Sequence, residues 1–234
     1  MYYGIPLRAR RLRRLYAPLV RPGSLCFDVG AHAGNRVRCF RQLGARVVAI
    51  EPQADFVRLL TWLYGRDREV AIVEAALGRS AGRAGLLVSE RTPTVTTLSR
   101  EWIDQVRRDP GFAAVRWAEG DSVELLTLDV LAERYGTPDF VKIDVEGYEA
   151  EVLAGLTTAV RAVSFEYLPS ARQIAFDCID RLAALGHYHY NWSPGESHRF
   201  ASPDWLDEGD IRAVIAGLPA TAQSGDVYAA RESE

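Results

Sequence analysis

The 234-residue chain has little cysteine and no long apolar run. Its three cysteines, Cys26, Cys39 and Cys178, are too few and too scattered for a disulfide framework or a zinc knuckle, so we expect a reducing compartment. No stretch is apolar over the length that a membrane span requires, and residues 1–14 lack the apolar core of a secretion signal. We therefore expect a cytoplasmic chain that does not enter a membrane.

An excess of basic charge is also missing. The 28 basic and 31 acidic side chains leave a formal net charge of -3, which disfavours a nucleic acid as partner because phosphates attract basic surfaces. Lysine is nearly absent: the chain contains a single lysine, Lys142, and 27 arginines. This preference for arginine over lysine indicates a coding bias rather than a chemical requirement. The surviving lysine either marks a place where a planar guanidinium does not fit or survives by chance.

The sequence from Leu25 to Gly34 predicts a short buried strand, a glycine turn and a helix. The apolar run 25–29 has strand length, and the following segment 36–43 places its apolar residues on one helical face. A second apolar run, 46–50, ends at Glu51 and Pro52. A strand, glycine turn, helix and second strand ending in an acid form the first half of a nucleotide-binding α/β unit.

The glycine pattern narrows the choice of nucleotide. In a dinucleotide fingerprint that starts at Gly30, the next two glycines would fall on His32 and Asn35, and no phosphate-loop Gly-Lys-Ser/Thr is present. The remaining pattern D-x-G-A-x-x-G-N, with Glu51 twenty-one residues after Gly30, resembles the first two motifs of an S-adenosylmethionine-dependent methyltransferase. A plain βα turn that binds nothing is the alternative.

The rest of the chain is interpreted as one α/β domain with two additions. Residues 1–22 form an N-terminal basic capping helix, whose arginines either face solvent or contact an acidic partner or a phosphate-bearing substrate. Residues 23–234 form the main domain. Within it, about 89–121 lacks a core pattern apart from a helix at 101–107, and loops of this length typically cover a substrate. Strands at 86–88 and 123–128 flank this lid insertion and are expected to pair.

Seven strands are predicted for the main sheet, with helices between the first five and a closing pair at the end. They lie at 25–29, 46–50, 70–73, 140–144, 162–167, 187–192 and 226–230. This is the layout of a class I methyltransferase, a Rossmann-like α/β fold. It has a mostly parallel seven-stranded sheet, helices on both faces and an antiparallel last strand.

Five motifs carry a resemblance to a known family. The most specific is Val141-Lys142-Ile143-Asp144-Val145-Glu146-Gly147-Tyr148-Glu149, followed by Glu151-Val152-Leu153-Ala154-Gly155. Segments 27–31, 50–52, 76–78 and 225–229 match in order and spacing. The chain resembles the FkbM family of S-adenosylmethionine-dependent methyltransferases, with S-adenosylhomocysteine as the implied product. It departs at His32, where relatives usually have asparagine, and at Asn35, where an aromatic residue is common.

The resemblance implies a cofactor site at the carboxyl ends of the strands. The turn after the first strand would hold the methionine end, Glu51 would accept the ribose hydroxyls, and Ala75 and Ala76 would face adenine. The predicted cofactor-binding residues are Asp28, Gly30, Ala31, His32, Gly34, Asn35, Glu51, Pro52, Ala75, Ala76 and Asp144.

The predicted catalytic residues are Lys142, Asp144 and Glu146, which alternate and so point to one face of a strand. Asp144 would lie beside the sulfonium or the acceptor, and Glu146 is the preferred base, with Glu166 as a second candidate. No metal is expected. A divalent ion that lowers the pKa of an acceptor hydroxyl is the competing mechanism, but His187 and His189 have no carboxylate spaced to complete such a site.

The sequence thus predicts an O-methyltransferase that acts on a hydroxyl of a small molecule, such as a sugar or a secondary metabolite. One rival is a non-catalytic module that retains the cofactor pocket. A nucleic-acid methyltransferase is disfavoured, because the chain has no Asn-Pro-Pro-aromatic motif for a flipped base. The identity of the acceptor and the formation of a homodimer stay open.

Overall fold

The computed structural model describes residues 6–89, 92–107 and 109–231. Residues 1–5 of the predicted N-terminal segment, residues 90–91 and 108 of the lid insertion, and residues 232–234 lie outside the described part. Within that part, no helix is both long enough and apolar enough to cross a membrane.

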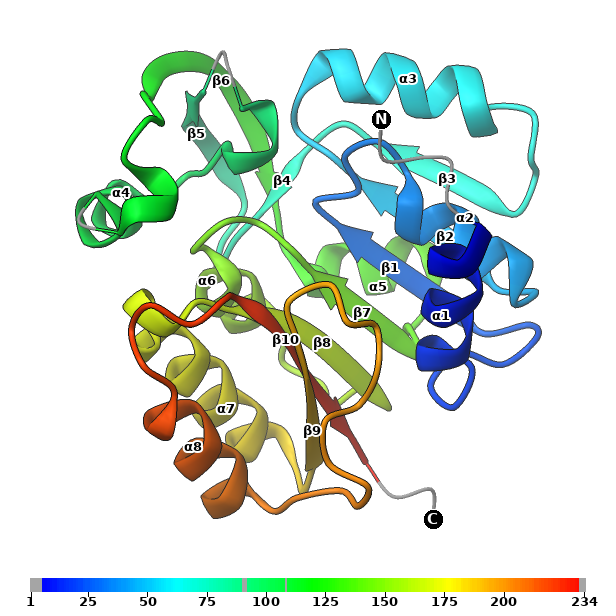
Figure 1. Ribbon diagram of the computed structural model, residues 1–234. Helices are drawn as coiled ribbons and strands as arrows, with labels where there is room; N and C mark the ends of the chain where they lie inside the picture. Colours follow the sequence, from blue (N-terminus) through cyan, green and yellow to red (C-terminus); the bar gives the residue numbers. More distant parts are fainter. Residues whose placement is uncertain (1–5, 90–91, 108, 232–234) are drawn as a thin grey trace.

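The main sheet has seven strands in the order β3-β2-β1-β7-β8-β10-β9 (Figure 1). Their bounds are β1 Leu25–Val29, β2 Arg46–Ile50, β3 Val70–Val73, β7 Phe140–Ile143, β8 Ala162–Tyr167, β9 His189–Pro194 and β10 Gly225–Ala230. Parallel pairing links β3, β2, β1, β7 and β8, and β10 pairs antiparallel with both β8 and β9. The predicted antiparallel last strand is confirmed.

Helices cover both faces of this sheet, which explains why its strands read as continuous apolar runs. One face packs against α5 (Leu128–Tyr135), α6 (Glu149–Ala154), α7 (Gln173–Leu185) and α8 (Glu208–Gly217). The other packs against α1 (Pro6–Tyr16), α2 (Asn35–Gln42) and α3 (Ala54–Tyr64). On β1, Phe27 belongs to the first core and Cys26 to the second, as strand alternation requires.

The basic N-terminal helix is part of this second core. Leu12, Leu15 and Tyr16 are buried on α1, and the ring of Tyr16 contacts Phe40, Phe140 and Tyr228 edge-on. The predicted capping helix is present, and it ends at Tyr16, within the predicted segment 1–22. Its buried face fixes the direction in which the arginines of α1 point.

A smaller three-stranded sheet forms a separate lobe, at the upper left of Figure 1. It consists of β4 (Ala76–Leu77), β6 (Ala118–Leu126) and β5 (Gly82–Val88), and the predicted pairing of its two long strands is confirmed. The segment between β5 and β6 contains α4 (Arg100–Val106) and short 3-10 helices at Pro93–Val95 and Pro110–Phe112; a third, Pro169–Ala171, precedes α7.

The helix predicted at 101–107 is present as α4, and it gives the insertion a small apolar core. Trp102, Ile103 and Val106 of α4 pack with Leu87 and with Ala171 from the main domain in a third apolar cluster. Strand β6 also begins at residue 118, so the insertion proper runs from 89 to 117 rather than to 121. We call residues 89–117 the cover segment.

Candidate functional site

A cavity of about 220 Å³ opens at the carboxyl ends of β1, β2 and β7, and the cover segment closes part of its rim. We call it the main cavity. Residues from the sheet edge and from the cover meet in its wall, which places it where open α/β sheets bind ligands. Its lining from the main-sheet side is Asp28 to Ala33, Asn35, Arg36, Glu51 to Gln53, Asp144 to Glu146 and Tyr148; from the small lobe and the cover it is Ala76, Leu77, Leu86, Thr94 and Thr96 to Leu98.

The turn after β1 requires glycine at its first position. Gly30 has a φ of +80°, and a Cβ there would lie 1.9 Å from the carbonyl oxygen of Asp144. The close approach arises because the backbone N–H of Asp144 donates to the carbonyl of Val29 across the parallel pair. Any side chain would therefore push the ends of β1 and β7 apart.

Glu51 is fixed at the end of β2 by the same turn. Its Oε2 accepts the backbone N–H of His32 at 2.8 Å, and its Oε1 accepts that of Gln53 at 2.9 Å. Burial raises the pKa of Glu51, and the two backbone N–H groups oppose that rise. The Gln53 side chain also hydrogen-bonds this carboxylate. A carboxylate has about four lone-pair sites, so Glu51 can still accept a hydroxyl group from the cavity.

Asp28 is a buried carboxylate without a hydrogen bond. It is 1% exposed and lines the main cavity, and neither oxygen has a partner among the residues that the structure describes. Burial raises the pKa of Asp28 to about 7, although Arg36 and Lys142 oppose the rise. A buried acid without a partner is costly, so this position favours a ligand that brings a donor or a positive charge.

The turn after β7 is strained and held from two sides. Glu146 has a φ of +54° and Gly147 a φ of +87°. Glu149 Oε1 accepts the backbone N–H groups of Val145 and Gly147 at 3.1 and 3.3 Å. From the cover, the indole of Trp102 packs so closely that a Cβ on Gly147 would lie 2.1 Å from it. A non-glycine residue at positive φ inside a cavity wall is typical of a functional turn.

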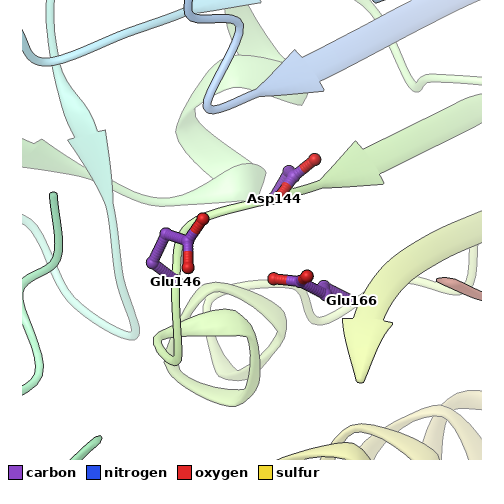
Figure 2. Close-up of side chains that lie close together, drawn as sticks. All are labelled: Asp144, Glu146 and Glu166. Carbon is purple, nitrogen blue, oxygen red and sulfur yellow. The ribbon is translucent and has the colours of Figure 1, made fainter. Parts of the chain in front are cut away.

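Three carboxylates converge beside this turn (Figure 2). One oxygen each of Asp144, Glu146 and Glu166 lies within 4.8 Å of the others. Burial and the neighbouring acids raise the pKa values of Glu146 and Glu166 well above the usual range. The group could share protons, act as a base, or hold a hard divalent cation. The sequence prediction found no carboxylate set for a metal, because it considered only positions near His187 and His189.

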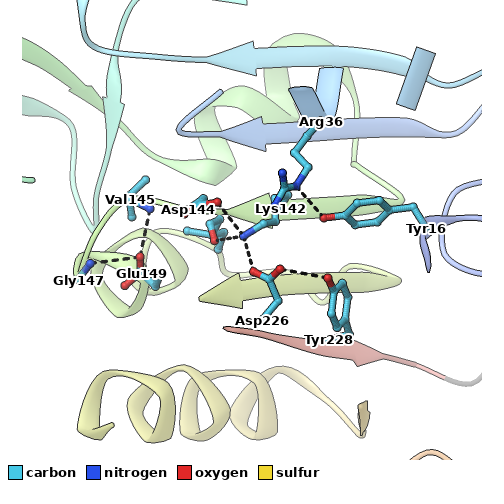
Figure 3. A network of polar contacts seen from close by, with 10 residues as sticks. Tyr16, Arg36, Lys142, Asp144, Val145, Gly147, Glu149, Asp226 and Tyr228 are labelled. Atoms are coloured by element: carbon cyan, nitrogen blue, oxygen red, sulfur yellow. Dashed lines mark hydrogen bonds and ion pairs between the residues drawn. The ribbon is translucent and has the colours of Figure 1, made fainter. Parts of the chain in front are cut away.

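Lys142 is buried beside Asp144, outside the lining of the main cavity (Figure 3). The side chain is fully buried, and its ammonium donates to Asp226 at 2.9 Å and to the carbonyl of Ile143 at 3.0 Å. Asp144 lies 3.4 Å from the same nitrogen. Burial alone would lower the pKa of Lys142, but Asp144 and Asp226 outweigh it and raise that pKa. Lys142 does not line the main cavity, so it acts there through its charge on Asp144 and Glu146 rather than by contact with a ligand.

The structure brings most of the predicted site residues together. Nine of the eleven predicted cofactor-binding residues line the main cavity, namely Asp28, Gly30, Ala31, His32, Asn35, Glu51, Pro52, Ala76 and Asp144. Gly34 and Ala75 do not line it: Gly34 precedes α2 behind the turn, and Ala75 is fully buried before β4, whose Leu77 lines the cavity instead. Of the predicted catalytic residues, Asp144 and Glu146 line it.

Sequence reasoning missed the polar groups that the cover segment contributes. Thr94, Thr96 and Thr97 line the main cavity, and the hydroxyl of Thr96 donates to the Gln53 side-chain oxygen at 3.2 Å. The density of threonine at 92–97 was the available signal. Arg36 lines the cavity from the first turn of α2, and the sequence pattern around it indicates only a helix.

Comparison with known proteins places this site in a family context. The model of the Methyltransferase FkbM domain matches residues 28–193, which include every residue of the site described above except those after β9. A curated relative from Haloferax volcanii, described as the hexuronic acid methyltransferase AglP, is 28% identical over 139 residues. That alignment covers 59% of this chain and 52% of the relative, so the chain spans about half the length of that relative.

A solved structure shares the fold. The O-methyltransferase from Bacillus cereus, solved in complex with S-adenosylhomocysteine, aligns with 99% of this chain and 84% of its own chain at 10% identity and a TM-score of 0.50. At this identity the likeness concerns the fold alone. Together with the strand order, it confirms the predicted class I, Rossmann-like arrangement.

Proposed function

Because the chain belongs to the FkbM methyltransferase family, we propose that it binds S-adenosylmethionine in the main cavity and methylates an oxygen of a small, hydroxyl-bearing acceptor, a sugar or a secondary metabolite. One observation carries the proposal. Glu51, held by two backbone N–H groups, and the partnerless Asp28 face one cavity together with Asp144.

The residues present fit this cofactor at each end. Glu51 would accept a ribose hydroxyl, because its oxygens are already oriented by His32 and Gln53. Asp28 would receive the positively charged amino group, which supplies the donor that this carboxylate lacks. Free N–H groups at the start of α2 suit the carboxylate of the methionine end. Ala76 and Leu77 leave a flat apolar wall for adenine.

When bound, the cofactor supplies an electrophilic methyl group on a sulfonium, and the chain must orient the acceptor and accept its proton. We assign the proton to Glu146, whose raised pKa makes its carboxylate a stronger base than a solvated glutamate. Glu166 sustains that raised pKa as a neighbouring acid. Asp144 faces the reacting centre, and Lys142 positions Asp144 from below. Threonines of the cover line the cavity and would limit the access of water.

The relative's name supports a sugar acid as one acceptor class. A hexuronic acid offers two kinds of oxygen, a hydroxyl and a carboxylate, and these give different products. Beside Asp144, Glu146 and Glu166 an acceptor carboxylate would be repelled, whereas a neutral hydroxyl would not. We therefore propose methyl ether formation on a hydroxyl.

The decisive experiment measures release of S-adenosylhomocysteine with a panel of glycosides, uronic acids and polyketides, with calorimetry of cofactor binding beside it. We expect turnover with at least one hydroxylated acceptor and a product that resists mild alkali, as an ether does and an ester does not. Glu51→Ala should weaken cofactor binding by about tenfold or more, since it removes hydrogen bonds from a charged acceptor. Glu133→Ala, an exposed acid on α5, is the matched control.

Unchanged cofactor affinity in Glu51→Ala refutes the cavity assignment. Cofactor binding without turnover on any acceptor favours the non-catalytic module. Binding of RNA that weakens steeply with salt would favour a nucleic-acid substrate instead.

A further inference from the structure

A second cavity, of about 120 Å³, lies beside the main one, between α1, α2 and the loop after β9. We call it the basic pocket. Asn35 and Arg36 line both cavities, so the two are neighbours at the start of α2. The charged residues of the basic pocket are Arg8, Arg36, Arg38, Glu196 and His198.

The lining of this pocket is positive. Three arginines face one glutamate, which leaves a net charge of +2 with the histidine neutral. The single carboxylate, Glu196, is already paired with Arg8. The pKa of His198 is lowered to about 4, first by burial and then by Arg36 and Arg8, although Asp226 opposes the shift. The share of this shift that Arg36 and Arg8 cause agrees with the positive charge of the lining, and a positive lining attracts anions.

Arg36 is the residue best placed to use that field. Its Nε donates to the Tyr16 hydroxyl at 3.1 Å, which fixes the plane of the guanidinium against α1 (Figure 3). Within the described part of the chain, no carboxylate forms an ion pair with Arg36 or Arg38. Burial lowers the pKa of Arg36, but Tyr16, Asp226 and Asp144 act on it and raise that pKa overall. A fixed guanidinium fork without a direct bond to a carboxylate suits the two oxygens of a carboxylate or phosphate.

Negative charge lies on the other side of the site from the basic pocket. Glu146 and Glu166 line a third, larger cavity, and Glu196 lines both that cavity and the basic pocket. A molecule that bridges the two would meet carboxylates at one end and arginines at the other. Such a gradient orients an acceptor that carries a hydroxyl at one end and an acid at the other.

We propose that the acceptor is an anionic, hydroxyl-bearing molecule of sugar size, whose carboxylate or phosphate lies in the basic pocket on Arg36 and Arg38 while its hydroxyl faces Glu146. This inference rests on the proposed function and names the acceptor class for the same site. It also gives the N-terminal helix a role beyond capping, because α1 supplies Arg8 and holds Arg36 through Tyr16.

The test uses the full chain saturated with S-adenosylhomocysteine and follows binding of D-glucuronate, D-glucose 6-phosphate and D-glucose by ligand-observed NMR. We expect at least one acidic sugar to bind about tenfold more tightly than glucose, the difference that one charged hydrogen-bonded contact provides. The tighter of the two acids identifies the anionic group.

Variants assign the effect to the pocket. Arg38→Gln, which lines the basic pocket and not the main cavity, should remove most of the advantage of the acidic sugar while S-adenosylhomocysteine binds as before. Arg14→Gln, an exposed arginine of α1 that lines neither cavity, should change neither. With S-adenosylhomocysteine bound, equal binding of the three sugars overturns the inference and leaves the proposed function standing.

Loss of S-adenosylhomocysteine affinity in Arg38→Gln also overturns it, because the pocket would then hold the cofactor's own carboxylate. Failure of S-adenosylhomocysteine to bind the unmodified chain instead refutes the proposed function.

Discussion

The hydroxyl of Thr97 donates a hydrogen bond of 2.6 Å to the carbonyl oxygen of Glu146. This bond ties the cover segment to the strained turn that presents the proposed base. The same hydroxyl accepts the backbone N–H of Ser99 at 2.9 Å, and Ser99 caps α4 through Trp102. The turn thus helps to position the cover segment, so a substitution at Thr97 should affect the position of both the cover segment and the turn.

Replacing Thr97 with valine keeps the shape and removes this bond. We expect kcat/KM for the acceptor to fall about fivefold, which corresponds to about 1 kcal/mol for one neutral hydrogen bond. Cofactor affinity should stay within twofold. Steady-state kinetics and calorimetry measure the two quantities. Thr61→Val is the matched control, because its hydroxyl also bonds a carbonyl, that of Val57 on α3, away from the site. An unchanged kcat/KM would mean that the cover closes without this link.

Removing the buried charge of Lys142 should strongly destabilise the fold. Lys142→Met leaves Asp226 buried without its partner at 2.9 Å, and breaking such a pair costs about 3–5 kcal/mol. Adding Asp226→Asn should recover most of that loss. Urea unfolding of the single and double variants measures both changes.

Lys142 also lowers the pKa of Glu146. If Lys142 has a positioning role, the activity of folded Lys142→Met should therefore rise with pH at a higher pH than in the unmodified protein. A purely structural lysine would leave the pH profile unmoved.

The pH dependence of turnover should report Glu146. Burial first, and then Glu166 and Asp144, raise the pKa of Glu146 well above its ordinary range. A base acts when deprotonated, so kcat/KM should rise with pH and reach its plateau above the range of a solvated glutamate. Glu166→Gln removes one neighbouring negative charge, so the rise should move to lower pH. A rise that does not move, or moves upward, would assign the base elsewhere.

Chelation should leave turnover unchanged. Lys142 already balances Asp144, and the raised pKa values of Glu146 and Glu166 indicate that protons can occupy the place of a cation. Activity with and without EDTA, followed by addition of magnesium, measures this directly. Loss on chelation and recovery with magnesium would make Asp144, Glu146 and Glu166 the ligands of a divalent ion that lowers the pKa of the acceptor hydroxyl.

Local sequence patterns predicted the elements of the main sheet because each depends on its own residues. The run of buried residues in β1, the glycine that follows it and the acid after β2 are adjacent or nearly adjacent signals, and Gly30 and Glu51 lie where they were expected. Their mutual arrangement follows from parallel pairing, which brings the ends of neighbouring strands to one edge.

Contacts between distant segments could not be predicted in this way. Asp226 reaches Lys142 across 84 positions, and Glu166 joins Glu146 only because β7 and β8 are neighbours in space. The buried residues of α4 have the spacing of a helix, which the sequence predicted, but their packing against Leu87 and Ala171 depends on the path of the loop. The basic pocket combines residues from α1, α2 and the loop after β9, and no sequence window contains all three.

Asp28 should cost stability in the cofactor-free protein, and the cost should depend on pH. Its folded pKa is raised from 3.8 to about 7, so between these values the unfolded chain releases a proton that the folded chain retains. Stability from this group therefore falls as pH rises through that window and stays low above it. Asp28→Asn cannot ionise. At pH 8 we expect it to be more stable by up to about 4 kcal/mol, roughly three pKa units at 1.36 kcal/mol each, and near pH 4 the gain should vanish.

Urea unfolding at the two pH values measures this gain, with Asp121→Asn, an exposed acid on β6, as the control that should show none. The same variant should bind S-adenosylhomocysteine more weakly, because the cofactor's amino group loses its carboxylate. If Asp28 serves ligand binding rather than folding, Asp28→Asn should gain stability and lose affinity for the cofactor. If Asp28→Asn is less stable at pH 8 and binds the cofactor normally, Asp28 has only a structural role in the sheet.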